Sequence, residues 1–331
     1  MKYMLLCLFS LLIMFGPCRA ETYSVEVLQV GNLLAFDHLY EGTVKGFEKH
    51  GLVEGKNLTI RRTVIDADAE AGLWEKVKIL IKIKGAAGDI VSRKPDAVIT
   101  VGTPATKYAK DRFIKAGIPL VFTGVAIPEL VGCPSKTEPG KGLTGVTIYM
   151  DPLDVIRISQ LALPNMKTIG IIHSDDENAV AYTEETAAKA PQLGVQVISK
   201  QVGMGDSIVP AIEEMIAQKI DAFFVPIDKY YGLRNFREAI DLGRMSHENM
   251  IPCISSITGD IKGSLLYIAP EFRTIGDLTS DQTARILNDK LKPEDIPIIR
   301  QENLIIIVDL DAAKKLGIDL PLQILQLAKT I

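Results

Sequence analysis

The chain has 331 residues, of which 47% are hydrophobic and 24% are charged, and its formal net charge at pH 7 is −4. This mildly acidic balance, without a basic cluster interleaved with aromatic residues, argues against a nucleic-acid partner. A chain of this length exceeds the size at which a single core usually keeps growing, so we expect two lobes.

The first 20 residues predict export. They carry Lys2 and an apolar run, and they end in the small-x-small pattern Cys18-Arg19-Ala20, which is typical of a secretory signal peptide. We expect cleavage after Ala20 and a periplasmic or extracellular mature chain, with lipidation of Cys18 as the alternative. The remaining cysteines, Cys133 and Cys253, are too few for a disulfide framework, and the sequence leaves open whether they pair.

Apolar strand-like runs alternate with helical patterns along the rest of the chain. The predicted strands cover residues 25–30, 58–64, 97–101, 119–123, 168–173, 195–202, 222–225 and 251–255. The predicted helices cover residues 38–50, 69–84, 104–116, 178–190, 208–218 and 233–244. Strands that alternate with helices of this length indicate parallel sheets with helices on both faces, so we predict a doubly wound α/β architecture. Segments 95–125 and 220–257 share one order of elements, which fits two lobes of similar topology.

Ligands of open α/β sheets bind beyond the carboxyl ends of the strands, so residues that follow the predicted strands are the candidate site residues. From the first half of the chain they are Asn32, Leu33, Phe36, Thr103, Pro104, Thr123, Val125 and Ala126. From the second half they are Ser174, Asn178, Asp228, Tyr230 and Ser255. We expect both sets to face a cleft between the lobes.

The sequence lacks motifs for catalysis, nucleotides or metals. The first strand is followed by VGNLLAFDH, which lacks the G-x-G-x-x-G fingerprint, and PGKG at 139–142 fails the pattern of a Walker phosphate loop. There is no G-x-S-x-G turn, and the four histidines have no metal-binding spacing. We therefore expect no catalytic residue, no cofactor and no metal.

Thr103 and Asp228 are the strongest candidates for ligand contact. Thr103 precedes Pro104 at a helix start, where free N–H groups and a hydroxyl suit a carboxylate or another anion; an ordinary N-cap is the alternative. Asp228 ends the apolar run FFVPID, and its carboxylate suits a ligand ammonium, with a cap on the helix near residue 233 as the alternative. Phe36 and Tyr230 are candidate walls of an apolar pocket, and ordinary packing is the alternative for the tyrosine.

Segments spread over almost the whole mature chain resemble a known family. They include GFEKHGLVEGKNLTI (46–60), PDAVITVGTPAT (95–106), IPLVFTGV (118–125), DAFFVPID (221–228) and IIVDLDAAKKLGIDLP (306–321). The sequence resembles the type I periplasmic substrate-binding proteins of ABC transporters, in particular the group with tryptophan- and tyrosine-binding members. The resemblance implies closure of two lobes around a small ligand, delivery to an ABC permease, and an ammonium-binding role for Asp228.

The resemblance also implies a hinge of three strands and discontinuous lobes. The expected first lobe comprises residues 21–124 plus 259–298 and the second comprises 125–258 plus 299–331, with crossings near 124–126, 256–259 and 298–302. We expect a monomer that binds an amino acid or a related small metabolite, with an aromatic ligand as one option. A ligand-sensing module for a membrane receptor such as a histidine kinase is the alternative function, and a secreted α/β enzyme is the third.

Several positions depart from the usual pattern of that family, including the segment HSDDENAV (173–180) and Phe272 in place of a tyrosine. Ala126 and Ile127 replace a hydroxyl and an acid, and Lys229 follows Asp228 where an asparagine is usual. The added positive charge at residue 229 suits an anionic group on the ligand. The resemblance therefore leaves the identity of the ligand open.

Overall fold

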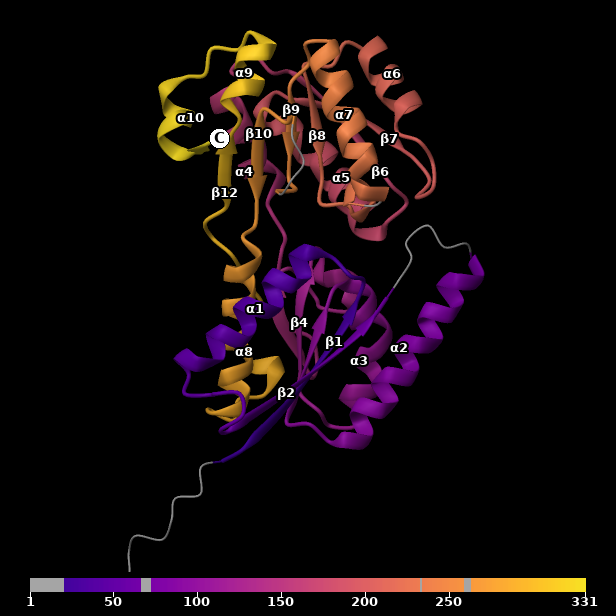
Figure 1. Cartoon of the computed structure of the whole chain (residues 1–331), viewed down its shortest axis with the longest axis vertical. Helices are drawn as coiled ribbons and strands as arrows, with labels where there is room; N and C mark the ends of the chain where they lie inside the picture. The colour runs from indigo at the N-terminus through magenta and orange to yellow at the C-terminus, as the bar shows by residue number, and fades with distance from the viewer. Residues whose placement is uncertain (1–20, 67–72, 233, 259–262) are drawn as a thin grey trace, which may run out of the picture.

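The computed structural model describes residues 21–66, 73–232, 234–258 and 263–331. The predicted signal peptide, with Cys18 and Ala20, lies outside these residues. Two lobes stand one above the other, each built around its own sheet (Figure 1). In the described part of the chain, no helix is both long and apolar enough to cross a membrane.

The sheet of the first lobe has six parallel strands in the order β11-β5-β4-β3-β1-β2. The strands are β1 (Tyr23–Val30), β2 (Leu58–Ile65), β3 (Ala97–Val101), β4 (Leu120–Val125), β5 (Leu143–Thr147) and β11 (Ile299–Arg300). Every residue of β3 and β4 is buried, because these central strands are covered on both faces, and their near-continuous apolar runs suit that position. One face carries α1 (Leu34–Lys49) and α8 (Phe272–Leu287), and the other carries α2 (Leu73–Arg93) and α3 (Thr103–Lys115) (Figure 1).

The sheet of the second lobe has seven strands in the order β13-β12-β10-β9-β8-β6-β7, parallel except where β10 meets β12. The strands are β6 (Thr168–His173), β7 (Gln196–Gln201), β8 (Ala222–Val225), β9 (Cys253–Ser255), β10 (Leu266–Ala269), β12 (Ile305–Val308) and β13 (Lys329–Thr330). One face packs on α4 (Pro152–Ala162) and α5 (Glu177–Lys189), and the other packs on α6 (Val209–Ala217) and α7 (Arg237–Glu248). Helices α9 (Leu310–Leu316) and α10 (Leu322–Leu327) lie at the outer edge beside β12 (Figure 1).

Two doubly wound α/β lobes confirm the predicted fold class, and each of the predicted strands is present. The remaining described elements are short 3-10 helices: η1 (Pro128–Val131), η2 (Ala190–Leu193), η3 (Lys229–Gly232), η4 (Arg234–Phe236) and η5 (Pro293–Asp295). The strands β5, β10, β11, β12 and β13 and the helices α4, α8, α9 and α10 are additions that the sequence analysis does not predict.

Two of the added strands correct the expected lobe boundaries. The expected second lobe includes residues 143–147, but β5 pairs with β4 in the first sheet. The expected first lobe includes residues 266–269, but β10 pairs with β9 and β12 in the second sheet. The chain therefore crosses between the sheets at residues 148–151, 270–271 and 301–304. The first two expected crossings, near 124–126 and 256–259, are wrong because β5 is rich in threonine and glycine and the short β10 is assigned only by its pairing with β9 and β12. The third expected crossing, near 298–302, overlaps the observed one.

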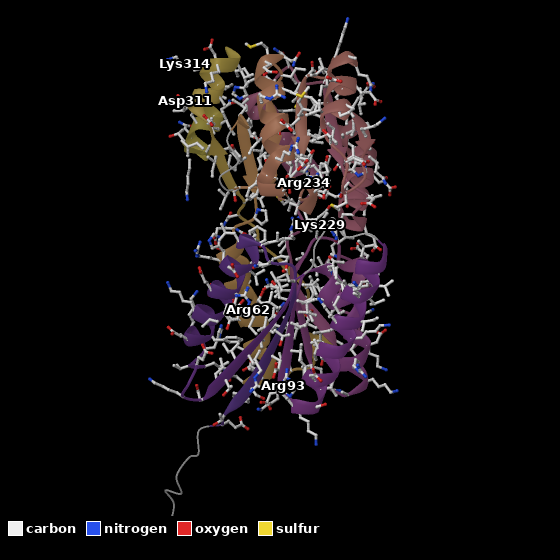
Figure 2. All side chains as sticks on the ribbon, turned by 45° about the vertical axis from the view of Figure 1, so that its right-hand side comes forward. Arg62, Arg93, Lys229, Arg234, Asp311 and Lys314 are labelled. Atoms are coloured by element: carbon white, nitrogen blue, oxygen red, sulfur yellow. The ribbon has the colours of Figure 1, made fainter. Side chains whose placement is uncertain are left out.

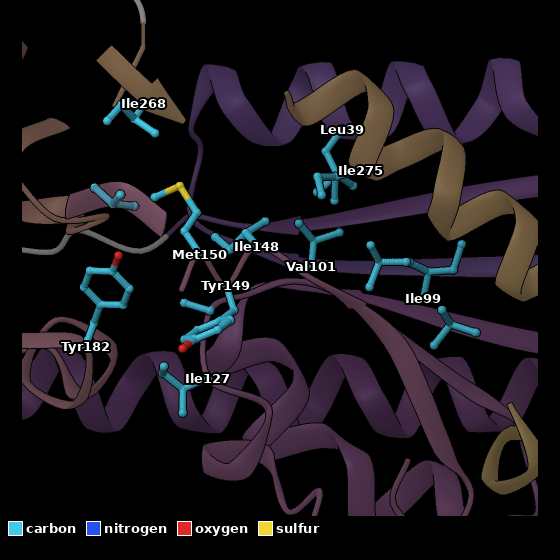
Figure 3. Packing of buried hydrophobic residues seen from close by; sticks show 14 of the residues in the cluster. Leu39, Ile99, Val101, Ile127, Ile148, Tyr149, Met150, Tyr182, Ile268 and Ile275 are labelled. Atoms are coloured by element: carbon cyan, nitrogen blue, oxygen red, sulfur yellow. The ribbon is translucent and has the colours of Figure 1, made fainter. Parts of the chain in front are cut away.

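The first crossing is packed against both lobes. One apolar cluster contains Leu39 and Ile275 in the first lobe, Ile148 and Met150 in the crossing, and Tyr182 in the second lobe (Figure 3). Packed side chains therefore join the lobes at this crossing in addition to the backbone. This arrangement is typical of a hinge about which packed lobes rotate, and it differs from a loose linker.

Helices α1 and α8 approach each other unusually closely at glycines. A Cβ added at Gly42 would overlap the carbonyl oxygen of Arg273, and one added at Gly276 would overlap the carbonyl oxygen of Leu39. In both cases the obstacle is backbone, which cannot turn away as a flexible side chain can. The two glycines therefore fix the distance between the two helices.

We predict that Gly276→Ala lowers the free energy of unfolding by about 1–3 kcal/mol, because the added methyl group forces two packed backbones apart. Gly85→Ala is the matched control, since Gly85 lies exposed in helix α2 and an added Cβ there meets nothing within 4 Å. The control should gain about 0.5–1 kcal/mol from helix propensity. Urea unfolding of the two variants measures both effects, and equal stability of the two would contradict the close packing.

Candidate functional site

The carboxyl ends of three strands in the first lobe support one aromatic ring. Gly31, Gly102 and Gly124 follow or end β1, β3 and β4, and all three have positive φ, at 96°, 88° and 67°. A Cβ added at Gly102 or Gly124 would come within 3.4 or 3.3 Å of the Phe36 ring. Glycine thus allows both this backbone conformation and the close approach of the ring. The half-buried Phe36 is thereby held at the edge of the sheet where a ligand is expected.

Arg62 of β2 holds the first turn of α1, which carries that ring. Its Nη2 donates to Asp37 Oδ1 at 2.6 Å and to Oε1 of the fully buried Gln29 at 2.7 Å. Its guanidinium carbon also lies 4.4 Å from the ring centre of Tyr40. The N-cap residue Leu33 provides no side-chain cap, so these contacts take over the anchoring of the helix start. Arg62, whose side chain lies in the first lobe (Figure 2), is not among the residues predicted from the sequence.

Asp228 is a buried connector within the second lobe. Its Oδ2 accepts a hydrogen bond from the backbone N–H of Ser174 at 2.7 Å, and its Oδ1 accepts from the Ser174 hydroxyl at 2.9 Å. Its Oδ1 also accepts from the backbone N–H of Tyr230 at 2.9 Å. Burial raises the pKa of this carboxyl above its usual range. The carboxylate therefore ties the loop after β6 to the loop after β8, and ligand contact by Asp228 stays a prediction.

The alternative interpretation of Asp228 as a helix cap is partly correct. Asp228 caps the short helix η3 directly after it, whereas α7 begins at Arg237 with Phe236 as its N-cap residue. The predicted start of that helix at residue 233 is too early, because η4 (Arg234–Phe236) precedes α7.

Lys229 is paired inside its own lobe. Its ammonium lies 2.8 Å from Asp176 Oδ2, and Asp176 in turn caps α5 by accepting from the N–H of Asn178 at 3.0 Å. Burial opposes ionisation of Asp176, but the charge and hydrogen bond of Lys229 together with the hydrogen bonds from Asn178 outweigh it and lower the pKa of this carboxyl. Lys229 lies on the side of the second lobe that faces the first (Figure 2). Because Asp176 already neutralises its charge, the interpretation of Lys229 as a contact for an anionic ligand group loses its main support.

Two candidate residues from opposite lobes meet. The Thr103 hydroxyl, at the start of α3, donates to Asn178 Oδ1 at 3.2 Å, at the start of α5. One turn further along α3, Lys107 forms an ion pair with Glu177 at 2.5 Å. The helix starts after β3 and β6 are thus brought together, as the strand-end rule predicts.

Several other candidate residues lie close to these groups. Ser174 is fully buried against Asp228, Asn32 is exposed at the end of β1, and Leu33 is the N-cap residue of α1. Pro104 is half-buried in the first turn of α3.

The remaining candidate residues are enclosed in the lobes. The Thr123 hydroxyl accepts from Thr279, and the Tyr230 hydroxyl donates to the carbonyl of Asp206. Val125 is fully buried and Ala126 is 8% exposed. The Ser255 hydroxyl donates to the carbonyl of Ile257. The structure gives Thr123, Val125, Ala126, Tyr230 and Ser255 packing roles, so their contact with a ligand stays a prediction.

The two cysteines are buried thiols in separate lobes. Cys133 packs in the core between α2, α3 and the first sheet, and Cys253 packs in the core of the second lobe under α6 and α7. Burial raises the pKa of the Cys133 thiol to about 11 and that of the Cys253 thiol to about 12. Both thiols are therefore protonated and unreactive at neutral pH. Among residues 21–66, 73–232, 234–258 and 263–331, no three His, Cys, Asp or Glu side chains gather as a metal site would require.

Comparison with known proteins gives a family match and several structural matches. A family model described as "ABC transporter substrate binding protein" matches residues 24–331. A comparison with curated protein sequences gives no match.

The similar solved structures are distant in sequence. A domain from Streptococcus pneumonia, solved in complex with L-Trp, has a TM-score of 0.76 and 21% identity over 94% of this chain and 100% of its own. An open, ligand-free substrate-binding protein with adhesive properties from Clostridium difficile has a TM-score of 0.75 and 22% identity, over 94% and 99%. A conserved domain protein from Vibrio cholerae has a TM-score of 0.74 and 22% identity, over 94% and 99%. At this identity the three structures establish similarity of fold.

We predict that Asp228→Asn lowers the free energy of unfolding by about 1–3 kcal/mol. An asparagine that keeps its oxygen toward the Ser174 hydroxyl and Tyr230 turns its NH₂ group against the N–H of Ser174, so one hydrogen bond is replaced by two opposed donors. Asp175→Asn is the control, because Asp175 is exposed in the same loop, and it should stay within about 0.5 kcal/mol of the parent. Urea unfolding distinguishes the outcomes, and a loss no larger than that of the control would contradict the connector role.

Proposed function

Because this chain belongs to the ABC transporter substrate-binding protein family, we propose that it captures a small solute between its two lobes outside the cytoplasm and presents it to an ABC permease. The observation that carries the proposal is the meeting of Thr103 and Asn178 from opposite lobes at 3.2 Å. It supports a site that both lobes complete together. The predicted signal peptide supports a location outside the cytoplasm.

The charges around the contact between Thr103 and Asn178 favour a zwitterionic ligand. In the second lobe, Lys229 pairs with Asp176, whereas the Asp228 carboxylate accepts hydrogen bonds from Ser174 and Tyr230, so its negative charge suits a ligand cation. In the first lobe, α3 starts at Thr103 without a side-chain cap, whereas α5 is capped by Asp176. The uncapped N–H groups of α3 suit a ligand carboxylate. An amino acid supplies both charges.

The Phe36 ring favours an apolar or aromatic side chain on that amino acid. The ring lies over the glycines that end three strands and is held there by the first turn of α1. An aromatic group on the ligand would stack on or meet it edge to face. The L-Trp complex of the neighbour from Streptococcus pneumonia is in line with this choice.

Isothermal titration calorimetry with L-tryptophan, L-tyrosine, L-phenylalanine and L-leucine tests the proposal. For the amino acid that binds most tightly, we expect the analogue without its carboxylate and the analogue without its ammonium to bind at least about tenfold more weakly, because each loses a charged hydrogen bond. For L-tryptophan these analogues are tryptamine and indole-3-propionate. Equal affinity for the amino acid and both analogues would contradict the zwitterion site, and no binding by any of the four would contradict the amino-acid proposal.

We predict that Phe36→Ala weakens binding of the same amino acid by about tenfold or more, since the ring supplies the apolar contact. Leu34→Ala is the matched control, because Leu34 is 64% exposed on the same turn of α1 and should bind as the parent does. Calorimetric titration of both variants measures the effect. If both variants bind like the parent, Phe36 is a packing residue and another residue supplies the apolar contact with the ligand.

A further inference from the structure

One face of α5 is directed at the first lobe and the hinge. Asn178, Tyr182, Glu185 and Lys189 are spaced by four, three and four residues, so they form a single stripe along the helix. Each of them contacts a residue of the first lobe or of the crossing at 148–151. Helix α5 of the second lobe therefore contacts the first lobe or the crossing at each of its turns.

The carboxyl-terminal end of α5 is fixed at the hinge. Tyr149, in the crossing, donates its hydroxyl to Glu185 at 2.6 Å and accepts from Lys189 at 3.2 Å. Glu185 also pairs with Lys136 of the first lobe at 3.2 Å, and the Lys136 ammonium lies 4.7 Å from the centre of the Tyr149 ring. The ring of Tyr149 packs edge-on against Tyr182, with their centroids 6.4 Å apart (Figure 3). These contacts tie this end of the helix to the point where the chain itself crosses.

The amino-terminal end of α5 touches the first lobe through groups that are far from any crossing in the sequence. Asn178 accepts from Thr103, and Glu177 pairs with Lys107 at 2.5 Å. The side chains of Lys107 and Glu177 are 33% and 55% exposed, so water and salt reach the pair. Both contacts exist only while the lobes are together, and both join protein side chains directly.

We propose that this end of α5 is a latch that holds the two lobes together in the absence of ligand. Its relevance to solute capture rests on the function proposed above, because Thr103 and Asn178 satisfy each other until a ligand takes their place. The exposed ion pair of Lys107 and Glu177 is the salt-sensitive part of the latch. Opening of the latch precedes entry of the solute.

Distances between spin labels on the two lobes test the latch without any ligand. Ile81→Cys in α2 and Ile240→Cys in α7 provide the attachment sites, since these residues are 64% and 56% exposed and the natural cysteines are buried. We expect Lys107→Glu to shift the main label distance by more than about 2 Å toward a longer value. The charge-swapped pair, Lys107→Glu with Glu177→Lys, should restore the parent distance.

Salt and a matched variant serve as controls. About 0.5 M NaCl should lengthen the distance in the parent and leave that in Lys107→Glu unchanged, because screening acts on the same pair. Arg244→Glu disrupts a similarly exposed ion pair, with Glu248 at 2.8 Å, that lies within α7, and it should leave the distance unchanged. Glu177→Gln, which keeps the shape of the side chain, is measured as a second variant in case Lys107→Glu impairs folding.

Parent-like distances in folded Lys107→Glu and Glu177→Gln would overturn the latch, and so would a swapped pair that stays open. The labels report on ligand-free protein, whereas calorimetry reports on solute binding. Absence of amino-acid binding therefore does not contradict the latch. Unchanged label distances, in turn, do not contradict the proposed amino-acid binding.

Discussion

The close packing of α1 against α8 determines both the hinge and the candidate site. Helix α8 follows β10 of the second sheet, yet Gly42 and Gly276 seat it on α1 in the first lobe. The chain must therefore leave the second lobe at residues 270–271 and return to it at 301–304. Two of the three crossings exist because of this helix pair. The same α1 carries Phe36 on its first turn, so the packing that creates the hinge also positions the aromatic ring.

Polar contacts between elements that are distant in the sequence hold the site loops in place. Asp228 joins two loops whose residues lie 54 positions apart, and Arg62 joins β2 to the start of α1. Each is a charged group whose hydrogen bonds are satisfied within its own lobe, which makes its burial tolerable. The groups expected to contact a solute therefore lie on loops that are already ordered in each lobe, and capture mainly requires the lobes to move relative to each other.

The sequence predicted those features that depend on local pattern. Long apolar runs identified β3, β4, β6 and β8, and the strand-end rule correctly brought Thr103 and Asn178 to one place. Prediction from the sequence failed where pairing between residues far apart in the chain decides the structure. The strand β5 has the sequence LTGVT, which does not indicate a lobe. Its pairing with β4 in the structure is what assigns it to the first lobe. Likewise, nothing near residue 229 indicates that Asp176 neutralises Lys229, and Tyr230 looks like a pocket wall until its hydroxyl is found bonded to Asp206.

Helix α5 acts geometrically as a lever. From Lys189, beside the hinge, to Asn178, at the contact with α3, it spans about 16 Å at 1.5 Å per residue. A rotation of about 10° around the Tyr149 end would move the Asn178 end by about 3 Å, which is enough to break a hydrogen bond. The tight ionic cluster at the hinge would change little over the same rotation. A small rotation at the crossing thus makes or breaks contacts at the Asn178 end. Because the displacement of that end grows with the length of α5, the length of this helix determines how small a rotation is sufficient.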